Sequence, residues 1–139
     1  MAPAKNIYLP VDVVVKTKAG RQIKAPEKVR GQEIIYDVGP ATVKIIGQSL
    51  KQAETILWNG PLGNFEKGYV EATEAVAKLI AASNAYSVIG GGDTVAAIEK
   101  LKLGKKFSFV STAGGAMLDF LAHGTLPGIE ALIRSKNLK

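Results

Sequence analysis

The sequence predicts an α/β protein with a mostly parallel sheet and helices on both of its faces. The main observation is a unit that occurs four times after residue 33: a short apolar run, a turn that contains glycine, and a segment with helical periodicity. Strands that alternate with helices favour right-handed crossovers and therefore parallel pairing. A length of 139 residues and a hydrophobic content of 47% suit one compact domain, so residues 1–139 are taken as a single domain.

Residues 1–33 are predicted to be an extended and hairpin region. The run at 7–17 is rich in β-branched residues and is interrupted by Pro10, which favours an edge strand. Residues 18–33 contain two glycines and a proline with little periodicity, which indicates a turn or a hairpin. Seven of the first 30 residues are Lys or Arg, against two acidic residues. Because no aromatic residues are interleaved with the six basic residues from Lys16 to Arg30, we interpret these charges as a solvated face rather than a nucleic-acid site.

Residues 34–139 hold the four strand-turn-helix units. The first has a strand at 34–38, and its apolar positions from Val43 to Leu50 are spaced i, i+3, i+4 and i+7, which predicts a helix with Pro40 in its first turn. The second unit is predicted to have a strand at 55–58, a turn at 59–68 and a helix at 72–80. The third has its strand at 86–89, its turn at 90–92 and its helix at 95–101. The fourth has its strand at 107–110, its turn at 111–115 and its helix at 117–121. A last short helix should start after Pro127.

Composition excludes several classes of site. The chain has no cysteine and a single histidine, so disulfides, iron–sulfur clusters, thiol nucleophiles and His-led metal sites are ruled out. No stretch approaches about 18 uninterrupted apolar residues, so no membrane segment is expected. We therefore predict a cytoplasmic chain that binds neither membrane nor nucleic acid.

The four turns should meet in space, because every strand-to-helix turn of a parallel sheet emerges at the same edge. Three of them are rich in glycine, and each leads into a helix N-terminus with unpaired N–H groups and a positive dipole end. Such an edge favours an anion, above all phosphate. The turns are residues 37–40, 59–68, 90–94 and 111–115.

The turn Gly-Gly-Gly-Asp-Thr at 90–94 carries the most chemical information. Its glycines permit close approach of a ligand to the backbone, and Thr94 offers a hydroxyl to a phosphate. The carboxylate of Asp93 would repel phosphate unless a hard cation lay between them, which Mg²⁺ does for nucleotides. The simpler alternative is that Asp93 only caps its helix.

Two polar residues of the second turn are candidates for nucleoside binding. Asn59 lies in an Asn-Gly-Pro turn and offers its amide to a base or a sugar hydroxyl. Glu66 offers its carboxylate to a ribose diol. Alternatively, Asn59 satisfies only its own turn and Glu66 is solvated. The neighbouring Trp58 falls on an apolar face and is expected in the core.

Four motifs occur in one order: DVGP at 37–40, WNGPLGNFE at 58–66, GGGDT at 90–94 and STAGGA at 111–116. Together with LPVDVVV at 9–15 and LPGIEAL at 126–132, they make the chain resemble the C-terminal part of the nucleotide-binding lobe of phosphoglycerate kinase over nearly its whole length. The resemblance implies a Rossmann-like, three-layer lobe of which this chain holds only a part.

The resemblance also implies an activity, that of a phosphotransferase with a carboxyl group as acceptor. In glycolysis this family transfers a phosphoryl group reversibly between 1,3-bisphosphoglycerate and Mg-ADP to give 3-phosphoglycerate and Mg-ATP, so ADP or ATP would be the nucleotide and Mg²⁺ the cofactor. Carried over by position, the resemblance implies that Asn59, Pro61 and Glu66 lie along the nucleoside and that Gly91, Gly92 and Thr94 bind the phosphates. Asp93 would face the metal, and Gly114 and Gly115 would face the transferred group.

The chain departs from the family pattern in two respects. Ala113 and Ala72 stand where glycine is usual, Asn64 replaces an apolar residue and Met117 a serine. If position 113 needed a positive φ, its Cβ would cost about 1 kcal/mol or more.

The larger departure is that the N-terminal lobe with its sugar-acid site, and the early part of the nucleotide lobe, have no counterpart here. We therefore expect no turnover from the isolated chain. The alternatives are a non-catalytic module that binds Mg-nucleotide or phosphate, and a fragment that assembles with a separate N-terminal piece.

Overall fold

The computed structural model describes residues 6–136, whose strands form two sheets. The first is antiparallel and consists of β1 (Val13–Thr17), β2 (Gly20–Lys24) and β3 (Ile34–Val38) in the order β2-β1-β3. The hairpin between β1 and β2 confirms the turn predicted at residues 18–33. β1 is the central strand rather than an edge strand. Pro10 lies ahead of it, so its missing N–H removes no hydrogen bond from the sheet.

The strand at residues 34–38 was expected to begin the parallel sheet, and this expectation is wrong. It pairs antiparallel with β1, with Val13 opposite Val38 and Lys16 opposite Ile34. Apolar runs of this length have the same local pattern in both kinds of sheet, so the choice of partner comes from contacts distant in sequence. The parallel sheet therefore has three strands rather than four.

The parallel sheet consists of β4 (Thr55–Asn59), β5 (Tyr86–Gly90) and β6 (Phe109–Val110) in the order β4-β5-β6. The helices that follow the strands confirm the predicted alternation, and the last one confirms the helix expected after Pro127. They are α1 (Pro40–Leu50), α2 (Glu71–Ala81), α3 (Gly92–Lys100), α4 (Gly115–His123) and α5 (Pro127–Lys136). Short 3₁₀ turns are η1 (Pro26–Lys28), η2 (Phe65–Lys67) and η3 (Gly104–Lys106).

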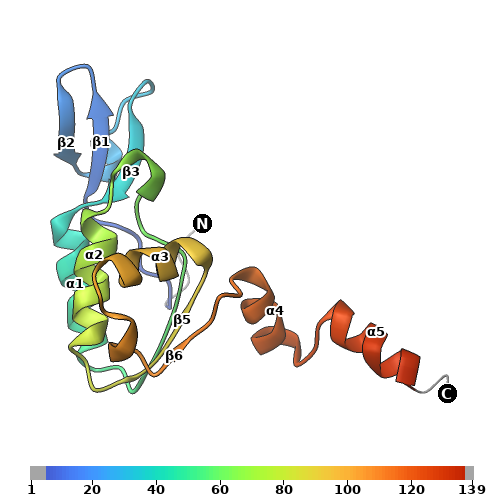
Figure 1. Ribbon diagram of the computed structural model, residues 1–139. Coiled ribbons are helices and arrows are strands. Elements are labelled where there is room, and N and C mark those ends of the chain that lie inside the picture. The colour runs from blue at the N-terminus through green and yellow to red at the C-terminus, as the bar shows by residue number, and fades with distance from the viewer. Residues whose placement is uncertain (1–5, 137–139) are drawn as a thin grey trace.

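The main core lies between the parallel sheet and the three helices α1, α2 and α3 (Figure 1). Trp58, which is 9% exposed, belongs to this core, as its apolar context predicted. Its fully buried partners are Ile89 of β5 and Ile98 of α3. Residues of α1 such as Val43 and Ile46 pack against the same cluster.

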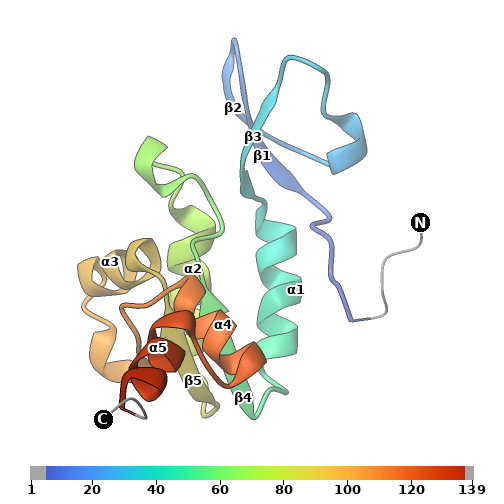
Figure 2. The same ribbon diagram turned by 90° about the vertical axis from the view of Figure 1, so that its right-hand side faces the viewer.

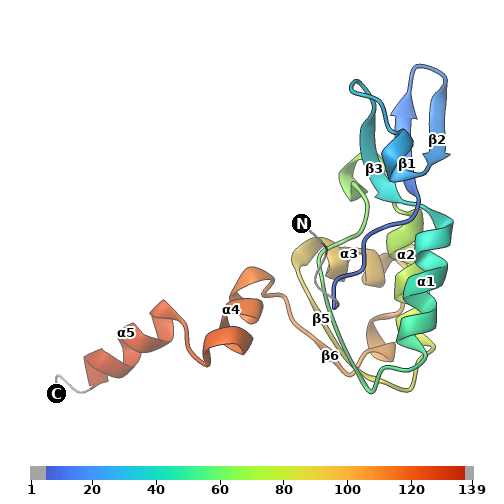
Figure 3. The same ribbon diagram turned by 180° about the vertical axis from the view of Figure 1, so that it is seen from behind.

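The second face of the parallel sheet is largely uncovered, so the expectation of helices on both faces is only partly met. Leu57, Tyr86 and Phe109 are 48%, 56% and 54% exposed. In Figure 2 the helices α4 and α5 overlap the strands because they lie nearer to the viewer. Figure 3 shows that both project away from the rest of the molecule. Apolar side chains on this arm are exposed too, including Leu121 and Leu132.

Two carboxylates join the antiparallel sheet to the helices. Asp12 accepts hydrogen bonds from the backbone N–H groups of Ala41 (2.9 Å) and Thr42 (2.8 Å), so it caps α1 from outside the helix. Burial opposes ionisation of Asp12, but these bonds and one from the Thr42 hydroxyl outweigh it and lower its pKa. Asp37 is 3% exposed and accepts a bond from the N–H of Ala72 in α2. Burial raises the pKa of Asp37.

The helices of residues 6–136 were compared with the length and hydropathy that a membrane span needs. Within residues 6–136, every helix is too short or too polar to span a bilayer.

Candidate functional site

The turns that follow β4, β5 and β6 meet at the carboxyl edge of the parallel sheet. A methyl group added to Gly114 would lie 3.3 Å from the Cα of Gly91, and one added to Gly91 would lie 3.4 Å from the backbone nitrogen of Gly60. Three segments that are far apart in sequence are therefore in direct contact, which confirms the predicted convergence for these turns. The fourth turn, at 37–40, follows the antiparallel sheet instead and contacts the start of α2 through Asp37.

The side chain of Asn59 lies inside this cluster of glycines. Its Oδ1 atom is buried, and the described residues offer it no hydrogen-bond donor. Methyl groups added to Gly90, Gly91 and Gly114 would lie 2.8, 3.5 and 3.7 Å from that oxygen. Asn59 therefore faces the glycine turns rather than only closing its own turn. An unpaired buried acceptor is unfavourable, so this oxygen suits a ligand that brings a donor or a cation.

Gly91 sets the start of α3. It has a φ of 92°, which is readily adopted only by glycine, and its carbonyl accepts the N–H of Val95 at 3.0 Å. The N-cap is therefore Gly91, and the expected N-cap role of Asp93 is wrong, because α3 already begins at Gly92. Both Gly92 and Asp93 are exposed on the first helical turn. The carboxylate of Asp93 stands beside unpaired N–H groups at the positive end of the helix.

Thr94 ties two of the turns together. Its side chain is fully buried, and its hydroxyl oxygen accepts the N–H of Gly60 at 2.9 Å. The hydroxyl that sequence reasoning offered to a phosphate is thus engaged in holding the loop after β4. Pro61, the next residue of that loop, is half-buried.

The turn after β6 ends in two glycines before α4. Gly114 is half-buried and accepts the N–H of Met117, whereas Gly115 is exposed as the first residue of α4. Among the described residues other than glycine, only Lys102 has a positive φ, so Ala113 is not strained by its Cβ. The alanine at this position is therefore compatible with the turn. Its backbone N–H donates to Ser111 Oγ at 3.1 Å.

Glu66 stands apart from the glycine cluster. It is an exposed residue of η2, the green helical turn beside β3 in Figure 1. The turn is attached to β3 by a 2.7 Å bond from the N–H of Asn64 to the carbonyl of Tyr36. Sequence reasoning missed the residues that hold this loop, Arg21 and Tyr36 among them. A basic residue in a hairpin carries no local signal for a contact with a loop some fifty positions later.

A metal centre made by the protein alone is not present in the described part of the chain. Within residues 6–136 no group of three or more His, Cys, Asp or Glu side chains could hold an ion. Asp93 is the single exposed carboxylate on the first turn of α3. It fits Mg²⁺, which prefers one or two carboxylates together with phosphate oxygens and water.

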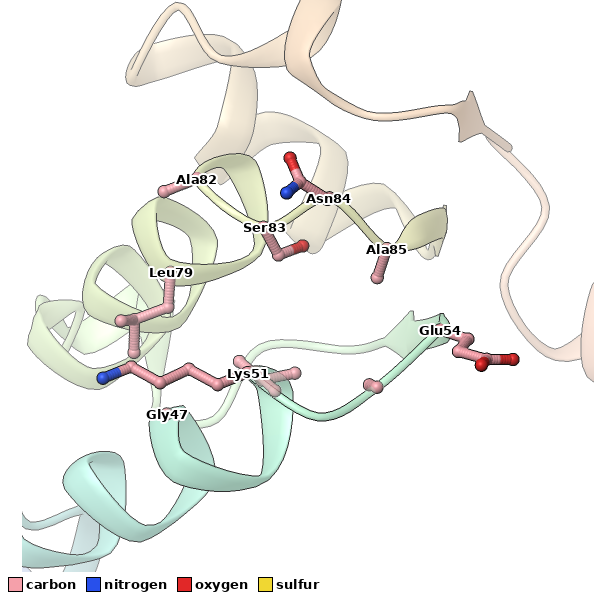
Figure 4. Close-up of a pocket in the computed structure, with 10 residues that line it drawn as sticks. Gly47, Lys51, Glu54, Leu79, Ala82, Ser83, Asn84 and Ala85 are labelled. Carbon is pink, nitrogen blue, oxygen red and sulfur yellow. The ribbon is translucent and has the colours of Figure 1, made fainter.

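A cavity of about 550 Å³ lies at the opposite edge of the parallel sheet (Figure 4). It is lined by the ends of α1 and α2 and by residues that precede β4 and β5, including Lys51, Glu54 and Ser83. The strands run from this cavity to the glycine turns, so it is remote from the candidate site.

Comparison with known proteins identifies relatives along nearly the whole chain. The family model described as phosphoglycerate kinase matches residues 1–124. A phosphoglycerate kinase of Desulfosudis oleivorans is 42% identical over 136 residues, which cover 94% of this chain and 34% of that protein. One of Coxiella burnetii is 46% identical over 138 residues, with coverage of 94% and 35%.

The solved structures that resemble this chain are phosphoglycerate kinases too. The structure of phosphoglycerate kinase from Coxiella burnetii has a TM-score of 0.76 and 45% identity, and the match covers 88% of this chain and 33% of that one. The crystal structure of phosphoglycerate kinase from Pyrococcus horikoshii has a TM-score of 0.77 and 37% identity, with coverage of 92% and 33%. The chain thus spans about a third of the length of the relatives that it matches.

Proposed function

Because this chain belongs to the phosphoglycerate kinase family, we propose that it supplies the nucleotide-binding part of a phosphoglycerate kinase. The reaction would be the reversible transfer of a phosphoryl group between 1,3-bisphosphoglycerate and Mg-ADP, which gives 3-phosphoglycerate and Mg-ATP. The single observation that carries the proposal is the contact of the turns after β4, β5 and β6. The helices α3 and α4 begin at this contact, and helix N-termini favour the binding of phosphate.

The proposed roles follow the positions along this edge. Gly91 and Gly92 would bind the nucleotide phosphates through their backbone, and Gly114 and Gly115 the transferred phosphoryl group. Thr94 would act through the loop that it holds and through its own backbone N–H. The nucleoside would lie along Asn59, Pro61 and Glu66. Phosphoryl transfer needs mainly positioning and charge stabilisation, which backbone N–H groups at helix ends can supply.

A magnesium ion would be held by Asp93 together with phosphate oxygens of the nucleotide. Asp93 is exposed and is not used as a helix cap, so its carboxylate is free to act as a hard oxygen donor. Neutralisation of phosphate charge is the chemistry that Mg²⁺ would supply there.

The first test is calorimetric titration of the chain with ADP, with and without Mg²⁺. We expect Asp93→Asn to weaken binding of Mg-ADP by about tenfold or more, because a metal ligand is lost. Without Mg²⁺ the same variant should bind ADP at least as well as the parent chain, because repulsion of phosphate is removed. Asp119→Asn, at an exposed position of α4, is the matched control and should change neither affinity. Equal weakening with and without Mg²⁺ would contradict the role of Asp93.

A second expected result concerns turnover. The isolated chain should give no phosphotransfer above a blank in a coupled assay at micromolar concentration, because the sugar-acid site belongs to the N-terminal lobe. Phosphotransfer above the blank would overturn this expectation.

The second candidate function is that of a fragment that assembles with a separately made N-terminal piece. One observation favours it: the second face of the parallel sheet and the arm made by α4 and α5 both expose apolar side chains. Surfaces of this kind are typical of interaction sites. Size-exclusion chromatography of the chain with and without a candidate piece separates this function from that of a stand-alone Mg-nucleotide or phosphate binder. A cytoplasmic location stays a prediction.

A further inference from the structure

Four side chains form a stack that joins the antiparallel sheet to the loop carrying Glu66. The rings of Tyr36 and Tyr69 are stacked, with centroids 4.5 Å apart and an interplanar angle of 11°. The guanidinium of Arg21 lies over the ring of Tyr69, 4.1 Å from its centroid. The ammonium of Lys67 lies over the ring of Tyr36, 5.2 Å from its centroid. This arrangement, here called the cation–tyrosine stack, consists of Arg21, Tyr36, Lys67 and Tyr69.

Hydrogen bonds attach the same residues to both ends of η2. At its start, the N–H of Asn64 donates to the carbonyl of Tyr36 at 2.7 Å. At its end, Nη2 of Arg21 donates to the carbonyl of Gly68 at 2.8 Å. Nη1 of Arg21 also pairs with Glu71 at the start of α2, at 2.6 Å. Arg21 therefore contacts the loop, the adjacent tyrosine and the helix that follows.

Glu66 lies between these two attachment points. It is the middle residue of η2, a turn closed by Asn64 Oδ1, which accepts the N–H of Lys67 at 3.0 Å, and by Gly68 with a φ of 75°. Its own side chain is exposed. The backbone position of Glu66 is consequently set by the turn, and the position of the turn is set by Tyr36 at one end and Arg21 at the other.

The energetics favour a geometric role for Arg21 over a stabilising one. The side chains of Arg21 and Glu71 are 46% and 66% exposed. Ion pairs this exposed contribute little to stability, because water screens them and two long side chains lose freedom. A planar guanidinium with two engaged donors and a ring beneath it nevertheless has a fixed orientation. Such a contact restricts a loop more than it stabilises the fold.

We propose that Arg21 is a positioning residue that holds Glu66 in place for the sugar diol of a bound nucleotide. This inference rests on the proposed function, because it takes Glu66 as the ribose ligand. A preorganised carboxylate binds a diol more tightly than a mobile one, since the loop then loses no freedom on binding. The phosphate end of the ligand is held by other turns, so Arg21 should affect the nucleoside end alone.

The test compares ADP with inorganic pyrophosphate, both with Mg²⁺, by calorimetric titration. Pyrophosphate has no sugar, so the ratio of the two affinities reports the nucleoside end and serves as an internal check of folding. We expect Glu66→Gln to lower the affinity for ADP about tenfold. We expect Arg21→Gln to lower it about fivefold. Neither variant should change the affinity for pyrophosphate. Arg21→Lys keeps the charge but not the paired donors, and should recover only part of the loss.

The double variant decides between positioning and general structural support. If Arg21 acts through Glu66, Arg21→Gln with Glu66→Gln should bind ADP as Glu66→Gln alone does, whereas independent effects would multiply. Arg134→Gln in α5, which breaks the exposed pair with Glu130, is the matched control and should leave the ratio unchanged.

Failure of the inference and failure of the proposed function look different. If the parent chain prefers ADP and Glu66→Gln removes that preference while Arg21→Gln does not, the role of Arg21 is wrong and the function stands. Loss of pyrophosphate affinity in both Arg21 variants would also overturn it, since the effect would then be general. If the parent chain binds neither ligand, both proposals fail.

Discussion

Replacement of Trp58 by alanine should lower the free energy of unfolding by about 3–5 kcal/mol. Trp58 is 9% exposed and packs in the core between the parallel sheet and α1, α2 and α3. Truncation removes a large apolar surface and leaves a cavity that a sheet strand cannot close. Single domains have a total stability of about 5–15 kcal/mol, so much of the chain's stability would be lost. Urea unfolding followed by circular dichroism measures the change, because the variant lacks the chain's only tryptophan.

The matched control is Tyr86→Ala in the same sheet. Tyr86 lies on the uncovered face and is 56% exposed, so its truncation should lower stability by less than about 1 kcal/mol. Equal losses in the two variants would mean that the two faces of the sheet are covered alike in solution. In that case α4 and α5, or a second molecule, would pack on the face that carries the exposed Leu57, Tyr86 and Phe109.

Replacement of Gly63 by alanine is the second change with a large expected effect. A methyl group there would lie 2.7 Å from Oδ1 of Asp37, and it would also overlap the backbone carbonyl of Tyr69. Asp37 is buried and holds the start of α2, and a backbone carbonyl cannot rotate away. We expect a loss of about 2–3 kcal/mol in the free energy of unfolding. Thermal or urea unfolding measures it.

Gly104→Ala is the control for this prediction. A methyl group on Gly104 would meet open space, so stability should change by no more than about 0.5 kcal/mol. Because Gly63 lies between Asn59 and Glu66, the first variant should also disturb the loop that carries the proposed nucleoside ligands. A Gly63→Ala chain as stable as the parent would contradict the close packing of loop, strand and helix at this point.

Much of the candidate site could be predicted from local pattern. The glycines at 90–92 and 114–115 follow short apolar runs and precede helical periodicity, which places them at strand-to-helix turns. Parallel pairing then brings the turns after β4, β5 and β6 to one edge, and the contact of Gly91 with Gly114 confirms it. The position of Asp93 near the start of α3 followed from the same reasoning, but its expected role as the N-cap was wrong, because the N-cap is Gly91.

Other features of the site were beyond local pattern. Asp93 is a residue type that often caps helices, but it does not cap α3. Gly91 adopts a positive φ and is the N-cap, so the helix starts at Gly92, one residue before Asp93. Thr94 was assigned to a ligand, but burial turns its hydroxyl toward Gly60 in the neighbouring turn. Glu66 was considered either a ribose ligand or a solvated residue, and it is exposed. The stack that holds its loop was not predicted, because Arg21 and Gly68 meet only in the folded chain.

The amino-acid order alone was enough to locate the strands, the helices and the glycine turns, because periodicity, glycine and proline act on neighbouring residues. Choice of partner was settled by folding: β3 joined β1 in a second sheet, and one face of the parallel sheet stayed open. Backbone pairing and burial join residues that lie tens of positions apart. Short apolar strands have the same local sequence pattern whichever sheet they belong to. Only tertiary packing could therefore decide which sheet each strand joined.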